Sequence, residues 1–175
     1  RMLFSLAPYN GFYDGNFTAV RSRLDLQHFQ PLAGEDTLIL ALRASLGSLW
    51  GVDSQDVPPS IRFYSGGGGS VRGYKYQSLG PRDSDDDPLG GKALFEVSVE
   101  PRWKISEEWG LVAFLDGGMV YDDFKDYGRD MRWGAGVGIR YYTVIGPVRF
   151  DVATPLNPRD DDDALQFYIS IGQSF

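Results

Sequence analysis

Apolar and polar residues alternate with a period of two along most of this chain. In residues 165–175 every second position is apolar except Gln173. The apolar positions are Leu165, Phe167, Ile169, Ile171 and Phe175. A two-residue period places neighbouring side chains on opposite faces of a β-strand. About eight segments follow this pattern, and they cover residues 2–9, 20–29, 37–49, 93–103, 111–121, 133–141, 148–156 and 165–175. None shows a sustained 3.6-residue period, so the sequence predicts an all-β protein with minimal helix content.

The predicted connections between these strands alternate in length. The short ones lie around residues 30–36, 104–109 and 142–147. Longer ones lie around 10–16, 122–130 and 157–163, and the longest lies at about 51–90. Strands of about ten residues with short turns on one side and long loops on the other are typical of an antiparallel transmembrane β-barrel.

Aromatic residues at the strand ends favour a membrane barrel over a soluble β-sandwich, the alternative that also shows alternation. Outer-membrane barrels carry aromatic girdles at both membrane interfaces. The strand-end aromatic residues are Trp50, Trp103, Trp109, Tyr121, Tyr141, Tyr142 and Phe175. The chain also stops on an aromatic residue at the end of an amphipathic strand, as outer-membrane proteins commonly do.

Composition removes several other classes of protein. Apolar residues make up 42% of the 175, but no run reaches the roughly 18 residues of a transmembrane helix. There is no cysteine and the only histidine is His28, so no disulfide, thiolate site or histidine zinc site is expected. A net charge of −7 argues against nucleic-acid binding. We expect no catalytic residue, metal or cofactor; an enzyme would be left with serine or carboxylate chemistry at a barrel mouth.

A glycine run lies inside the longest predicted loop, where residues 62–74 read RFYSGGGGSVRGY. A phosphate cradle would need a following GK[ST] sequence and the start of a helix, and neither is evident. A flexible linker is a second alternative, but a linker does not need aromatic and basic residues around its glycines.

Several segments, taken in order, resemble a known family. They are the VRGY tetrad at 71–74 after RFY at 62–64, FLDGG at 114–118, GAGVGIR at 134–140, IGPVRFD at 145–151 and LQFYIS at 165–170. They resemble the C-terminal barrel half of outer-membrane assembly factors, the superfamily of BamA, TamA and the two-partner secretion transporters. The TamA branch is the most similar, through the segment at 145–151 and the chain ending. The resemblance covers about residues 62–175, and the upstream third fits by strand pattern alone.

The resemblance implies that residues 1–175 are the C-terminal portion of a barrel of about sixteen strands, preceded by periplasmic POTRA domains. It also implies that the loop at about 51–90 enters the barrel lumen. The loop–lumen motif carried over to this chain is Val71, Arg72, Gly73 and Tyr74. In the family the tetrad arginine bonds to lumen acids, so Arg72 is expected to pair with Asp116 and Glu100. Strand parity independently places both acids away from lipid; the alternative is that each is an ordinary solvated lumen charge.

Other residues are singled out by position. Gly134, Gly136 and Gly138 share the lumen parity and leave a groove without side chains, where a loop backbone approaches closely or the barrel bends. The expected C-terminal strand signal consists of Phe167, Ile169, Ile171 and Phe175. The acidic stretches 83–87 and 160–163 are expected to be solvated outer loops, with calcium binding as the alternative. Lumen charges without individual roles are expected at Arg21, Arg23, Asp25 and Arg43.

The implied function is non-enzymatic: assembly, insertion or translocation of outer-membrane proteins such as autotransporters, through a barrel with a lateral seam. The implied location is the outer membrane of a Gram-negative bacterium. Expected partners are the lipid bilayer, client outer-membrane proteins and a periplasmic or inner-membrane protein, with no nucleic acid. A fragment with open sheet edges is also expected to self-associate, because lipid cannot satisfy an unpaired edge. The alternative function is a two-partner-type pore that secretes a soluble client.

Overall fold

The strands form one antiparallel sheet. The computed structural model describes residues 1–12, 16–34, 37–53 and 56–172. Its strands are β1 (Met2–Phe12), β2 (Asn16–Ala33), β3 (Leu38–Trp50), β4 (Ala93–Lys104), β5 (Trp109–Tyr121), β6 (Arg132–Thr143), β7 (Gly146–Pro155) and β8 (Gln166–Ile171). The 3₁₀ helices η2 (Pro59–Ile61) and η3 (Phe124–Asp126) lie in the β3–β4 and β5–β6 connections. The predicted all-β class and the predicted number of strands are confirmed.

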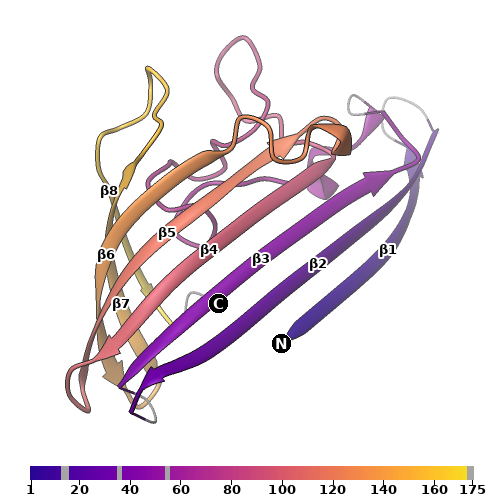
Figure 1. Cartoon of the computed structure of the whole chain (residues 1–175). Helices are drawn as coiled ribbons and strands as arrows, with labels where there is room; N and C mark the ends of the chain where they lie inside the picture. The colour runs from indigo at the N-terminus through magenta and orange to yellow at the C-terminus, as the bar shows by residue number, and fades with distance from the viewer. Residues whose placement is uncertain (13–15, 35–36, 54–55, 173–175) are drawn as a thin grey trace.

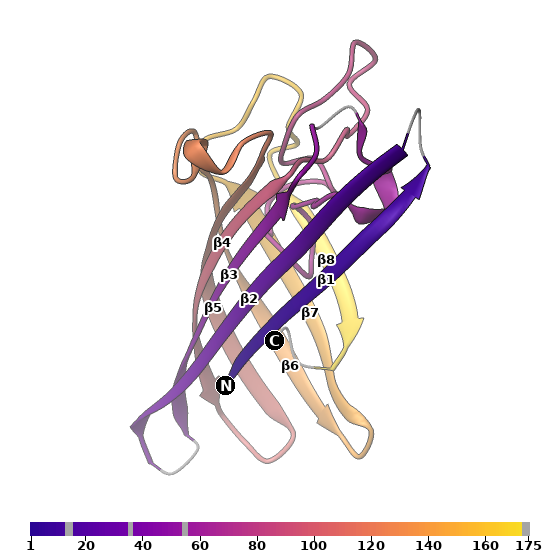
Figure 2. The ribbon, with the colours of Figure 1, turned by 90° about the vertical axis from the view of Figure 1, so that its right-hand side faces the viewer.

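Each strand pairs with its neighbours in the chain, in the order β1-β2-β3-β4-β5-β6-β7-β8. The strands are tilted and the sheet is curved (Figure 1). The β3–β4 connection, residues 51–92, lies on the concave side near the end of the sheet that carries the long connections (Figure 2). Strands β1 and β8 are the two edges, and within the described residues they pair only with β2 and β7. The sheet is therefore open.

The strand bounds differ most from the prediction at β1, β2 and β8, and β2 runs to Ala33, into the predicted 30–36 connection. The connection around 10–16 was expected to be long, which is wrong: β1 and β2 stay paired up to Phe12 and Asn16. Gly11 permits this extension because a Cβ there would come within 2.9 Å of the Phe17 ring, which crosses over it. Within the described residues the last strand ends at Ile171, and a bend follows at Gly172, whose φ of +100° is unfavourable for other residues. The rest of the predicted strand, residues 173–175, lies outside the described residues.

The concave and convex faces of the sheet have opposite character. On the concave face, side chains of the 51–92 connection pack against strand residues in clusters that contain Ala19, Leu49, Val57, Phe63, Leu94 and Val120, and Val71, Tyr74 and Leu79. The convex face exposes large apolar side chains, among them Val99, Trp103, Leu111, Leu115, Val137, Ile139, Phe150, Phe167 and Ile169. Among the described residues, no helix is long and apolar enough to cross a membrane. The polar groups of the strands are thus gathered with the long loop on the concave side.

Candidate functional site

The glycine run builds a tight turn that carries the VRGY tetrad toward the sheet. Gly66 and Gly67 have φ values of +107° and +98°, which residues with a side chain rarely adopt. The turn is closed by hydrogen bonds from the Gly67 N–H to the Val71 carbonyl oxygen at 3.1 Å and from the Gly66 N–H to Ser70 Oγ at 2.9 Å. Because the Gly66 and Gly67 N–H groups are used within the turn, this part of the run is not a free linker, and these two groups are not available to an anion.

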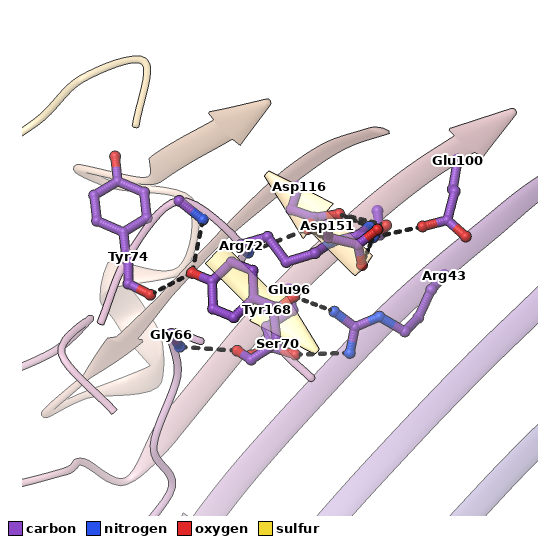
Figure 3. Close-up of polar contacts among 12 residues, drawn as sticks. Arg43, Gly66, Ser70, Arg72, Tyr74, Glu96, Glu100, Asp116, Asp151 and Tyr168 are labelled. Atoms are coloured by element: carbon purple, nitrogen blue, oxygen red, sulfur yellow. Dashed lines mark hydrogen bonds and ion pairs between the residues drawn. The ribbon is translucent and has the colours of Figure 1, made fainter. Parts of the chain in front are cut away.

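Arg72 projects from this turn into a set of carboxylates on the concave face (Figure 3). Its Nε and Nη2 atoms donate to the two oxygens of Asp116 at 2.7 and 3.0 Å, a bidentate pair. Its Nη1 atom donates to Glu100 Oε2 at 2.6 Å, and its backbone N–H donates to Asp116 Oδ2 at 3.1 Å. The structure therefore brings together Arg72 and both acids that the sequence pattern singles out.

The Arg72 cluster is shielded from water. Arg72 is 2% exposed, and Glu100 and Asp116 are 0% exposed. The guanidinium carbon also lies 3.4 Å from the centroid of the Phe114 ring. Burial lowers the pKa of an arginine, but the hydrogen bonds and charges of Asp116 and Glu100 outweigh burial and raise the pKa of Arg72 above its ordinary value. Arg72 is therefore a permanent cation held by buried anions.

Asp151 is a member of this cluster that sequence reasoning missed. Its oxygens accept from Arg140 Nη1 at 2.5 Å, Arg149 Nη2 at 3.0 Å and Arg72 Nη1 at 3.5 Å. Arg140 and Arg149 lie directly opposite each other on β6 and β7, so Asp151 separates two like charges. The sequence signal that could have indicated Asp151 was its position in the 145–151 segment, two residues after Arg149 and therefore on the same face of the strand.

A second anchor holds the glycine turn to β3 and β4. Arg43 was expected to have no individual role, which is wrong: its Nη1 atom donates to Glu96 Oε2 at 3.1 Å and its Nη2 atom to the Ser70 carbonyl oxygen at 2.8 Å. Glu96 also accepts from the Ser65 hydroxyl at 2.8 Å and from the Ser70 hydroxyl. The loop is thus fixed at both the glycine turn and the tetrad.

The three lumen glycines do not serve one purpose. At Gly134 an added Cβ would collide with the carbonyl oxygen of Arg72, so this glycine admits the tetrad backbone. At Gly136 the space is taken by the Phe114 ring and the β7 backbone, and at Gly138 by the Asp151 carboxylate. The expectation of a continuous groove for the loop backbone is therefore wrong for the last two positions, where side chains fill it.

The proposed C-terminal signal is placed only in part. Phe167, Ile169 and Ile171 lie on β8 and are exposed on the convex face. Phe175 lies outside the described residues.

The acidic stretch 160–163 is not simply a solvated loop. Asp161 forms an ion pair with Arg82, Asp162 with Arg159 and Asp163 with Lys75. The hydrogen bond from Arg82 holds the pKa of Asp161 below its ordinary value. Since Lys75 and Arg82 belong to the 51–92 connection, these ion pairs join it to the β7–β8 connection. Within the described ranges, no group of three or more histidine, cysteine, aspartate or glutamate residues is arranged to hold a metal.

A known domain covers the fold and the Arg72 cluster together. The Omp85 superfamily domain matches residues 3–175. The chain belongs to the Omp85 superfamily. This Omp85 chain is 34% identical over 127 residues to the outer membrane protein assembly factor BamA of Nitratidesulfovibrio vulgaris, a match that covers 69% of the chain and 16% of that protein. It is 29% identical over 181 residues to BamA of Neisseria meningitidis serogroup B, covering 84% of the chain and 23% of that protein.

More distant relatives and a solved structure agree with this assignment. The mouse sorting and assembly machinery component 50 homolog is 39% identical over 95 residues, 51% of this Omp85 chain and 18% of the mouse protein. The crystal structure of Haemophilus ducreyi BamA lacking POTRA domains 1–3 superposes with a TM-score of 0.70 at 23% identity, covering 87% of the chain and 36% of that structure. At this identity the superposition supports the fold, a transmembrane barrel sheet.

The comparisons confirm the superfamily and the fold class predicted from sequence. They also place the Omp85 chain in the outer membrane of a Gram-negative bacterium. The TamA branch stays a prediction, since the relatives above are BamA and component 50 proteins. The chain spans about a fifth of the length of the two BamA relatives, as the 16% and 23% coverages show.

Proposed function

We propose that this Omp85 chain is the C-terminal portion of a larger barrel that assembles other outer-membrane proteins, autotransporters among them, without covalent chemistry. Superfamily membership and relatives named outer membrane protein assembly factor support the proposal. The proposed partners are the lipid bilayer, the client proteins and a periplasmic or inner-membrane protein.

The observation that carries the proposal is a rigidly anchored lumen loop beside a short strand at an open sheet edge. Within the described residues, strand β8 has six residues, whereas its neighbour β7 has ten. Lipid offers no hydrogen-bond partner to the backbone groups of such an edge, so a client strand that pairs with it gains all of those bonds. This is strand addition to a sheet edge, in which backbone hydrogen bonds supply the affinity.

The loop anchors favour assembly over secretion through the lumen. Arg72 and Arg43 hold the 51–92 connection to four different strands. Arg43 itself lies on β3, and the acids that the two arginines bind lie on three others. These acids are Glu96 and Glu100 on β4, Asp116 on β5 and Asp151 on β7. A soluble client that passed through the lumen would have to displace this buried charge network. Breaking a buried ion pair costs about 3–5 kcal/mol. A client that enters at the edge leaves the network in place.

Cysteine cross-linking in the full-length protein tests the edge. The chain has no cysteine, so a single introduced thiol is the only one in this part of the protein. Ile169→Cys on β8 is expected to form a disulfide with a cysteine in the terminal strand of a client barrel during assembly. Val137→Cys is the matched control, because this residue is also apolar and exposed but lies on the interior strand β6. Equal cross-linking at both positions contradicts edge pairing. No cross-link at Ile169→Cys, together with conductance that rises during transport of a soluble client, would instead identify a secretion pore.

A further inference from the structure

The tyrosine of the edge strand touches the tetrad itself. Tyr168 lies on β8 with the parity of the concave face, and its hydroxyl group sits between two backbone groups of the VRGY tetrad (Figure 3). The hydroxyl oxygen accepts from the Gly73 N–H at 3.0 Å, and the hydroxyl donates to the Tyr74 carbonyl oxygen at 2.8 Å. One side chain of the edge strand therefore satisfies a donor and an acceptor of the lumen loop.

The Tyr168 ring is enclosed by the same elements that hold the loop. It packs against the buried cluster of Val112, Phe114 and Ala153, and Phe114 also lies under the Arg72 guanidinium. On the loop side, a Cβ added to Gly68 would come within 2.9 Å of the ring. The glycine turn thus lies directly against the tyrosine, and the Arg72 cluster and Tyr168 share one packing surface.

Strand β8 has few other attachments. Among the described residues, its register with β7 runs from Val148–Ile171 to Ala153–Gln166, and the Gly172 N–H then donates to the Pro147 carbonyl oxygen at 2.8 Å. Phe167, Ile169 and Ile171 are exposed on the convex face. The ion pair between Arg82 and Asp161 fixes the preceding connection and not the strand. Within the described part of the chain, Tyr168 is therefore the side chain of β8 that hydrogen-bonds to the lumen loop.

We propose that Tyr168 is a positioning residue that couples the seating of the VRGY tetrad to the pairing of β8 with β7. When β8 moves away from β7, the hydroxyl leaves, and the Gly73 N–H and Tyr74 carbonyl lose their partner together. Buried backbone groups without hydrogen-bond partners are unfavourable, so the seated position of the tetrad becomes less stable and the tetrad loosens. This inference deepens the proposed function, because β8 is the strand at which we propose that clients pair.

Hydrogen exchange measured by mass spectrometry on the full-length protein in nanodiscs tests the coupling. Tyr168→Phe keeps the ring and removes both hydrogen bonds. We expect peptides covering 66–79 and 166–171 to exchange roughly five- to tenfold faster, as expected for the loss of one or two hydrogen bonds. Tyr141→Phe is the matched control: this tyrosine lies on β6, is exposed, and makes no hydrogen bond through its hydroxyl to the described residues. It should change neither peptide.

A second variant separates coupling from a merely structural role. Ile169→Gly weakens β8 from the convex face without touching the loop, since glycine lowers strand stability. With Tyr168 present, it should speed exchange in the 66–79 peptide; in the Tyr168→Phe background it should add nothing there. Loop exchange that is unchanged by Tyr168→Phe, or that rises additively in the double variant, overturns the inference. No client is present in this experiment, so a negative result here would not contradict client pairing at the edge. In the same way, a failed cross-linking test would not contradict the coupling through Tyr168.

Discussion

The charge balance of the Arg72 cluster predicts that its two main partners are not equally costly to remove. The cluster contains four arginines and three acids, namely Arg72, Arg102, Arg140 and Arg149, and Glu100, Asp116 and Asp151. Arg72→Ala leaves three charges of each sign. Asp116→Ala leaves four cations facing two anions in a site shielded from water. We therefore expect Asp116→Ala to destabilise the protein more than Arg72→Ala.

The contacts that remain after each substitution determine how much unfolding free energy is lost. After Arg72→Ala, Asp116 keeps the Ser98 hydroxyl at 2.6 Å and Glu100 keeps Arg102 at 2.8 Å. The loss should then fall near the lower end of the range of about 3–5 kcal/mol for breaking a buried pair. After Asp116→Ala, the Arg72 guanidinium loses its bidentate partner, and the loss should reach the upper end of that range. The double variant removes one cation and one anion, so it should cost no more than Asp116→Ala alone.

Urea unfolding of the full-length protein, followed by tryptophan fluorescence, measures these free energies, and client assembly is assayed on the same samples. The control pair is Arg129 and Asp126, which are 2.8 Å apart but exposed beside η3. Replacing either by alanine should cost about 0–1 kcal/mol with little coupling. A larger loss for Arg72→Ala than for Asp116→Ala, or losses that add fully in the double variant, would refute the charge-balance reasoning.

Three further predictions follow from the same geometry. Arg72→Lys should restore only part of the stability and assembly lost in Arg72→Ala, because an ammonium group cannot bind Asp116 bidentately as the guanidinium does. Full recovery in the urea assay would argue against a role for the bidentate contact. Gly134→Ala should expel the tetrad and expose the loop to added protease, whereas Gly69→Ala, which meets no atom within 4 Å, should leave the digestion pattern unchanged. Spin labels at Val137 should report lipid and a label at Ser170 should report the lumen or water; uniform water exposure at both would remove the membrane assignment.

The sequence by itself determined the number of strands and which face of each strand carries the apolar side chains. A period of two is a local property, because successive side chains of an extended chain point to opposite sides whatever the rest of the protein does. The alternation around Val137 and Ile169 therefore predicted two exposed convex-face residues correctly. The same parity turned Asp116 and Glu100 inward, and the family motif named Arg72 as the residue that meets them.

Only the tertiary structure decided how the lumen residues combine. Asp151 meets both Arg140 and Arg149 because the register of β6 and β7 places Gly138 opposite it, and alternation within one strand does not show which residue of the next strand lies opposite. Tyr168 reaches Gly73 across 95 positions of sequence. Such contacts depend on the path of the 51–92 connection and on the curvature of the sheet, which are set jointly by many weak interactions. Periodicity can show that a side chain faces the lumen, but the partner it finds there is fixed only when the loop and all the strands are in place.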